Sequence, residues 1–324
     1  MNFIRKIGKF IRTWILIFAI LAGIGSYFLY VSIPALDGTH AAMLGVIEVV
    51  QPLLIFAMLF VTFCKVNPRR LRLCRWHGIL LAFQTLMFVG LGFWDMALPA
   101  DSGLRVILEG AMICFICPVA TAAAVVTRKL GGSATHITTY TILINLVAAL
   151  VIPVMVPLVR PSATMGMWDA SVLILGKVFP LLLLPLMLAF LVRRLWPRLH
   201  YIVTCQRDLA FRLWVVALLL ATAVTTRFIM HSTVPLSVAL WLVVVTLVAC
   251  VMQFAIGWWV GERYGDRTTA GQALGQKNTV LAIWLGYTFF TPITSVAGGF
   301  YSIFHNVINS WQLYRRDHPR IPRQ

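Results

Sequence analysis

Charged residues are scarce in this chain. They make up 11% of its 324 residues, whereas hydrophobic residue types make up 60%. A soluble domain carries roughly 25% charged residues, so this chain lacks the polar surface that water requires. This scarcity excludes a soluble enzyme and predicts an integral membrane protein.

Acidic residues are the scarcer charged class. Asp and Glu number 10 against 27 Lys and Arg, which gives a net charge of +17. The basic residues cluster in short hydrophilic breaks between apolar runs, where the positive-inside rule and anionic lipid headgroups explain them. This placement argues against a nucleic-acid partner and makes the lipid bilayer the partner of the basic surface.

Cysteines are also few, and their positions predict six free thiols rather than a disulfide framework. Cys114 and Cys117 form a C-x-x-C pair inside an apolar run. This pair has two interpretations, a ligand pair for a soft metal or arsenite, or two small buried residues. No second Cys or His pair accompanies it in that run, which favours the second interpretation and predicts no metal site.

Apolar runs between the hydrophilic breaks fit ten helices of about 20 residues each, and leave no room for a sizeable soluble domain. Of the 27 Lys and Arg residues, 22 fall on the side of the N-terminus, three on the opposite side and two within spans. This split predicts an even number of spans in the plasma (inner) membrane, with both termini and the basic tail 315–324 in the cytoplasm. The predicted spans are 13–34, 43–64, 77–97, 104–130, 135–159, 168–192, 209–230, 234–260, 268–290 and 293–314.

Two of these spans contain residues that interrupt a membrane helix. Span four holds Pro118 in CPVATAAAVVT, and span nine holds Gly271, Gly275 and several amides in GQALGQKNT. Broken helices at matching positions in two halves of a chain indicate a transport site. Each of the two interrupted spans is the fourth in a set of five. Because five is an odd number, the second set of spans crosses the membrane in the opposite orientation to the first set. The predicted fold class is therefore an all-α polytopic membrane protein of ten helices in two inverted five-helix repeats, with discontinuous crossing helices 4 and 9.

Lys277 is a basic residue predicted near the middle of the bilayer. A lysine there costs about 2.5 to 3.5 kcal/mol on insertion scales, so it is a functional candidate, with its neighbour Gln276. The alternative is that Lys277 extends to the cytoplasmic surface. The acidic residues within spans lie toward the outer ends, so no carboxylate is expected beside Lys277. A positive charge without a nearby negative charge attracts anions, which predicts an anionic substrate. Lys277 would act as its counter-charge or as a titratable switch.

Other polar side chains interrupt spans three and ten. Gln84 lies in LLAFQTLMF of span three and is interpreted as an interhelical bridge or a pocket wall. His305 and Asn306 lie in FYSIFHNVINSW of span ten. A single membrane histidine often only bonds a neighbouring helix, and with Asn306 it could equally line a cavity.

At these residues the sequence resembles the bile acid:sodium symporter family. The resemblance covers roughly 51–314 and is strongest in CPVATAAAVVTRKLGG, GQALGQKNTVLAIW and GGFYSIFHNVINSW. It implies a panel domain of spans 1, 2, 6 and 7 (13–64 and 168–230) and a core domain of spans 3–5 and 8–10 (77–159 and 234–314). It also implies that unwound spans four and nine cross beside the substrate cavity, lined by residues that match ligand-facing positions of the family: Thr121, Asn278, His305 and Asn306.

The departures from the family pattern concern the sodium ligands. Ala273 and Lys277 replace the Glu and Gln of the family motif in span nine, and Ala123 and Ala124 replace the Ser and Asn in span four. A hard cation requires oxygen ligands, so these changes make sodium coupling doubtful. Gln84 falls near another sodium-ligand position of the family and joins Lys277 and Gln276 as a candidate coupling residue.

The leading functional hypothesis is a secondary transporter that moves an organic anion, bile-acid-like or a small carboxylate, by alternating access. Lys277 would replace the sodium charge, and proton coupling stays open. The alternatives are a non-transporting membrane receptor or sensor on the same fold, and a related arsenite-type exporter. No nucleophile and base pair occurs within the spans, so neither an enzyme nor a cofactor is expected.

Overall fold

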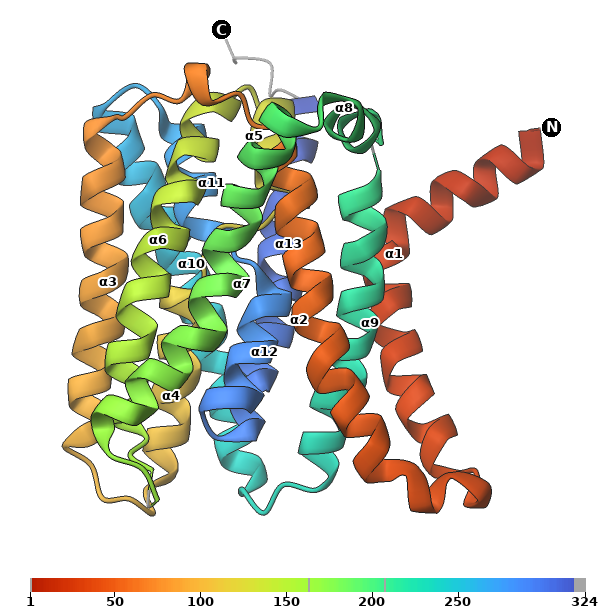
Figure 1. Cartoon of the computed structure of the whole chain (residues 1–324), viewed down its shortest axis with the longest axis vertical. Helices are drawn as coiled ribbons and strands as arrows, with labels where there is room; N and C mark the ends of the chain where they lie inside the picture. The colour runs from red at the N-terminus through yellow and green to blue at the C-terminus, as the bar shows by residue number, and fades with distance from the viewer. Residues whose placement is uncertain (1, 163, 207, 318–324) are drawn as a thin grey trace, which may run out of the picture.

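The structure is a computed structural model that describes residues 2–162, 164–206 and 208–317 (Figure 1). Helices dominate this part of the chain, and it contains no β-strand. The long helices are α1 (Asn2–Val31), α2 (His40–Cys64), α3 (Arg75–Met96), α6 (Ala134–Val159), α7 (Met167–Leu195), α9 (Leu209–Met230), α10 (Leu236–Arg263) and α13 (Ser295–Asp317). The shorter ones are α4 (Gly103–Ile116), α5 (Ala123–Lys129), α8 (Pro197–Cys205), α11 (Arg267–Gly275) and α12 (Thr279–Phe289), with 3-10 turns η1 (Pro34–Thr39), η2 (Pro68–Arg70) and η3 (Pro292–Thr294).

Six helices, α2, α3, α6, α7, α9 and α10, are long and apolar enough to cross a membrane. Large apolar side chains cover the outside of the bundle, such as Leu86 of α3 and Leu240 of α10, both exposed. Water would oppose this exposure, whereas lipid tails favour it. The chain is therefore an integral membrane protein.

The other predicted spans fall on less regular elements. Span one, 13–34, corresponds to α1, which begins at Asn2 and ends at Val31, and span ten, 293–314, corresponds to α13. Spans four and nine are each two short helices, α4 with α5 and α11 with α12. Helix α8, in the loop between spans six and seven, was not predicted. The inverted relation between the two halves stays a prediction.

The helices pack in a bundle whose two interrupted helices lie inside it. Helix α2 packs against α7 and α9, and α1 packs against α9. On the other side of the bundle, α4 packs against α3 and α10, α11 against α10, and α12 against α13. The division into panel and core domains stays a prediction.

The two ends of the bundle differ in charge. The upper end in Figure 1 carries α5, α8 and the end of α13, together with basic pairs such as Arg69 and Arg70 of η2 and Arg315 and Arg316 of α13. We call it the basic end. The α3–α4 and α6–α7 connections form the opposite end.

Candidate functional site

The first interruption separates α4 from α5. Helix α4 ends at Ile116 and α5 begins at Ala123. Pro118 has no backbone N–H, and it disfavours a helical conformation in the residue before it. Cys117 is accordingly extended, with φ −56° and ψ 130°. The carbonyl groups at the C-terminal end of α4 therefore lie inside the bundle and need hydrogen-bond donors.

The second interruption separates α11 from α12. Helix α11 ends at Gly275, and Gln276 is extended, with φ −87° and ψ 116°. A Cβ atom on Gly275 would lie 2.4 Å from the ring of Phe254 on α10. Glycine is thus required for α11 to end this close to α10. The side chain of Asn278 caps the next helix by accepting a hydrogen bond from the N–H of Leu281 over 3.3 Å.

The two interruptions meet and bond to each other. Val119 and Lys277 form an antiparallel bridge. The N–H of Ala120 donates to the carbonyl oxygen of Gln276 over 3.2 Å, and the N–H of Asn278 donates to that of Pro118 over 2.8 Å. We call this meeting point, residues 117–122 and 276–278, the crossing. It satisfies backbone groups that each interruption frees.

Lys277 lies inside the crossing. Its side chain is 1% exposed, and Nζ donates a hydrogen bond to the carbonyl oxygen of Phe115 over 3.2 Å. The alternative in which Lys277 extends to the surface is therefore wrong. No carboxylate pairs with it among the described residues, and its ionisable neighbours are the thiols of Cys114, Cys117 and Cys250. The ammonium thus lies at the C-terminal end of α4, where the helix dipole favours a positive charge.

Neutral side chains satisfy three more carbonyl groups near the two helix ends. Gln84 donates to the carbonyl oxygen of Cys117 over 3.2 Å and accepts a bond from Tyr140 over 3.0 Å. Gln253 donates to the carbonyl oxygen of Cys114 over 3.1 Å. At the end of α11, the hydroxyl of Tyr301 donates to the carbonyl oxygen of Gly275 over 2.9 Å. Gln84 therefore bridges helices, one of its two predicted interpretations.

A chain of amides leads from the crossing to the basic end. Gln276 donates to the side-chain oxygen of Gln272, whose amide donates in turn to Asn309 over 3.1 Å and to Gln312 over 3.2 Å. Gln312 lies in the wall of a cavity at the basic end. Sequence reasoning missed this chain beyond Gln276, although the spacing of Gln272 and Gln276, one helical turn apart, could have indicated it.

The four predicted substrate residues lie near the crossing or on α13. Thr121 is half-buried within the first interruption, and Asn278 is buried within the second. His305 is buried with its ring edge against Tyr301, and its Nδ1 atom has no partner in the described part of the chain. Asn306 donates to the carbonyl oxygen of Ser302 over 2.6 Å. No hydrogen bond joins these four side chains to one another within the described residues, so their common cavity stays a prediction.

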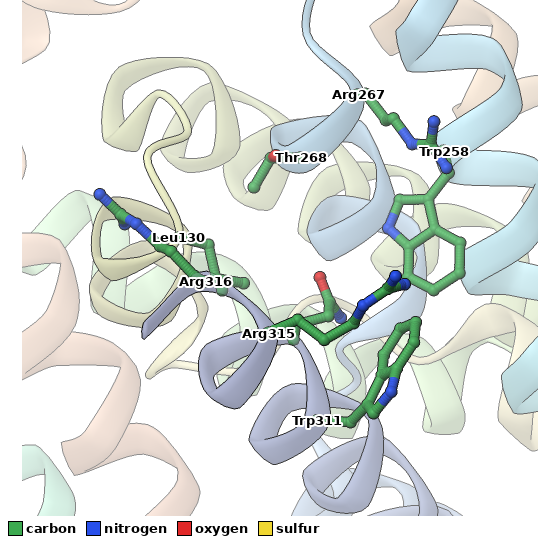
Figure 2. A pocket seen from close by; sticks show the side chains of 8 residues that line it. Leu130, Trp258, Arg267, Thr268, Trp311, Arg315 and Arg316 are labelled. Atoms are coloured by element: carbon green, nitrogen blue, oxygen red, sulfur yellow. The ribbon is translucent and has the colours of Figure 1, made fainter. Parts of the chain in front are cut away.

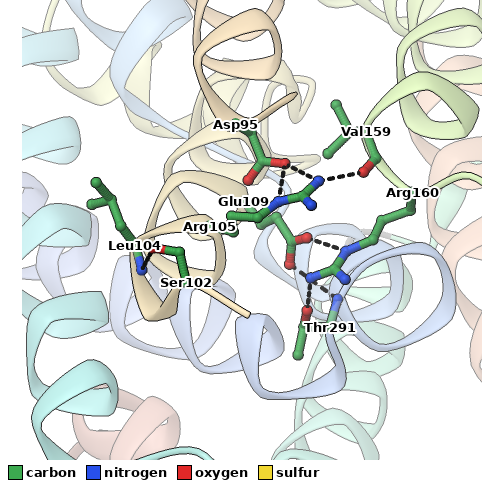
Figure 3. Close-up of polar contacts among 8 residues, drawn as sticks. All are labelled: Asp95, Ser102, Leu104, Arg105, Glu109, Val159, Arg160 and Thr291. Atoms are coloured by element: carbon green, nitrogen blue, oxygen red, sulfur yellow. Dashed lines mark hydrogen bonds and ion pairs between the residues drawn. The ribbon is translucent and has the colours of Figure 1, made fainter. Parts of the chain in front are cut away.

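Two acidic residues of the spans, Asp95 and Glu109, form ion pairs at the opposite end (Figure 3). Arg105 donates to Asp95 over 2.7 Å and to the carbonyl oxygen of Val159 over 2.8 Å. Arg160 donates to Glu109 and to the hydroxyl of Thr291, while the N–H of Thr291 donates to Glu109 over 3.1 Å. These bonds join α3, α4, α6 and the residues before η3. Neither of these two carboxylates reaches the crossing, and no carboxylate of the described residues pairs with Lys277.

Comparison with known proteins adds one finding. The sequence from residue 32 to residue 305 matches the model of the SBF-like CPA transporter family. This range includes both interruptions, Lys277 and His305. No curated protein matches the chain.

Proposed function

Because the chain belongs to the SBF-like CPA transporter family, we propose that it is a secondary transporter of an organic anion that works without sodium. The observation that carries the proposal is the buried hydrogen bond from Lys277 to Phe115 at the carbonyl end of α4. In transporters with interrupted helices, such carbonyl ends hold the coupling cation, and helix N-termini face anionic substrate groups. In this chain, an ammonium of the protein itself occupies the cation position.

The neighbouring groups favour an anion. Helix α12 begins at the crossing, so the positive end of its dipole faces the same region as Lys277. The side-chain nitrogen of Asn278 is buried without a hydrogen-bond partner among the described residues, and it can donate to an acceptor such as a carboxylate. One unpaired donor and a helix N-terminus thus lie at the crossing beside Lys277, and no acidic residue is among the residues of the crossing. The expected substrate is bile-acid-like or a small carboxylate.

The transport cycle follows from this arrangement. Ten spans in two inverted repeats, with both termini cytoplasmic in the plasma membrane, would alternate access to the crossing by movement of the core domain against the panel domain. Lys277 would stay bound to α4 and supply the charge that sodium supplies elsewhere. Thr121, His305 and Asn306 would line the substrate cavity. A proton on Lys277 is the coupling ion that this chemistry allows.

Uptake by reconstituted protein tests the proposal. Proteoliposomes in choline buffer receive labelled organic anions, one bile acid and several small carboxylates, with protein-free liposomes as the control. We expect saturable uptake of at least one anion. Saturable binding to the purified protein without uptake would instead favour a receptor or sensor and would contradict the transporter proposal.

Asn278 provides a test of substrate contact that spares the fold. Asn278→Ala removes the cap of α12, which costs about 1 kcal/mol of stability, whereas Asn278→Ser keeps a capping oxygen and removes the amide donor. We expect Asn278→Ser to retain the parent's thermal stability and to weaken anion affinity by about tenfold, the effect of one lost hydrogen bond to a charged group. Affinity equal to that of the parent would make Asn278 a capping residue only.

A further inference from the structure

A cavity of about 290 Å³ opens at the basic end, between α10, α11, α13 and the residue after α5. Its wall combines two tryptophans with three arginines (Figure 2). Trp258 of α10 and Trp311 of α13 lie side by side, with ring centroids 6.5 Å apart. We call this cavity the arginine pocket. It is separate from the crossing and shares none of the predicted substrate residues.

Two arginines of the pocket, Arg315 and Arg316, lie close to neighbouring residues. The guanidinium of Arg315 lies 5.0 Å from the ring centroid of Trp311. Three atoms of the Arg316 guanidinium lie 3.7 Å from where a Cβ atom on Gly131 would be, and Gly131 has a φ of +87°. The positive φ favours glycine at this turn. These contacts bring both guanidinium groups to the wall of the cavity.

The charge of the pocket is not neutralised by the protein. Arg267 donates to both oxygens of Glu262, over 3.1 Å and 3.2 Å. Neither Arg315 nor Arg316 has a carboxylate partner in the described part of the chain. Three guanidinium groups and one carboxylate leave a net positive pocket. Such a pocket attracts an anion.

Gln312 adds a hydrogen-bond donor to the wall of the pocket. Its side-chain oxygen accepts a bond from Gln272 over 3.2 Å. Its side-chain nitrogen is buried and has no partner among the described residues. This nitrogen can donate to a ligand, and an anion needs donors.

We propose that the arginine pocket binds a phosphate group. Arginines favour phosphate because their planar donors match its oxygens in pairs. The pocket lies at the basic end, among tryptophans of the kind that lie at the level of lipid headgroups. Basic pockets between membrane helices at this level bind anionic headgroups. The phosphate can therefore come from an anionic phospholipid or from a soluble phosphate, and the chemistry of recognition is the same.

Binding to the full-length protein in neutral detergent tests this proposal without depending on transport. In one arm, native mass spectrometry counts bound phosphatidylglycerol, with phosphatidylcholine as the uncharged comparison. In the other arm, inorganic phosphate is titrated, and the thermal unfolding midpoint is recorded. The test variant is Arg315→Gln/Arg316→Gln. Its matched control is Arg69→Gln/Arg70→Gln, which removes the same charge from exposed residues at the same end of the molecule.

We expect Arg315→Gln/Arg316→Gln to weaken binding by about tenfold or more, because charge-assisted bonds to phosphate are lost, and the control to bind like the parent. Preference for phosphatidylglycerol identifies a lipid as the source, and stabilisation by inorganic phosphate identifies a soluble ligand. If the test variant does not fold, Arg315→Lys/Arg316→Lys keeps the charge and is expected to lose part of the affinity. Equal losses in test and control variants, equal binding of both lipids without a phosphate effect, or no binding would overturn the proposal.

Discussion

Replacing Lys277 with glutamine is expected to reduce anion affinity and uptake by about a hundredfold. The estimate follows from Coulomb's law, since a positive charge about 6 Å from a carboxylate contributes about 3 kcal/mol at an effective dielectric constant of about 20. Folding should survive, because removing a buried charge that lacks a charged partner relieves its desolvation cost. The measurement is anion binding and uptake by parent and variant across pH, since the lysine is also the candidate proton carrier.

Two further variants make the Lys277 experiment specific. Lys177→Gln removes the other lysine within a predicted span, but Lys177 is exposed on α7, so we expect parental transport. Lys277→Arg keeps the charge but places a larger guanidinium in a site where the lysine is 1% exposed, so we expect incomplete rescue. If Lys277→Gln binds and transports like the parent, the lysine is peripheral to the substrate, and its role as a sodium substitute must be abandoned.

The second large effect concerns stability at the opposite end of the bundle. Glu109 is fully buried, pairs with Arg160 and accepts the N–H of Thr291. Glu109→Ala leaves both donors unpaired, and breaking a buried ion pair in this way costs about 3 to 5 kcal/mol. We expect a loss of about 3 kcal/mol, because Arg160 is itself partly exposed. Equilibrium unfolding in mixed micelles measures it.

Glu262 provides the matched control for Glu109. It also pairs with an arginine, Arg267, but its side chain is 63% exposed. Surface ion pairs contribute about 0 to 1 kcal/mol, so Glu262→Ala should unfold almost like the parent. A similar small loss in both variants would mean that the bonds of Glu109 do not hold α4 to α6 and to the residues before η3.

The interruptions of spans four and nine could be predicted from sequence because their cause is local. Pro118 removes a backbone donor, and a cluster of glycines and amides weakens span nine wherever it lies. The burial of Lys277 could not be decided in the same way. It depends on the distance between the side chain and the end of α4, which comes from a segment more than 150 residues earlier in the chain.

The ion pairs and the amide chain could not be predicted for the same reason. The sequence places the acidic residues of the spans toward the outer ends, but only the packing of α4 against neighbouring helices brings Glu109 and Arg160 together. Tyr301 and Gln253 lie within apolar runs of the sequence. Their role in satisfying the carbonyl groups at the helix ends becomes visible only when the crossing is assembled.

The sodium dependence of anion uptake tests the central claim most directly. Proteoliposomes of the parent protein take up the transported anion while external Na⁺ is exchanged for K⁺ or choline at constant ionic strength and membrane potential. In the proposed account, Lys277 supplies the positive charge at the carbonyl end of α4, so we predict equal initial rates in all three salts. Saturable stimulation by Na⁺, absent with K⁺ and choline, would contradict the account.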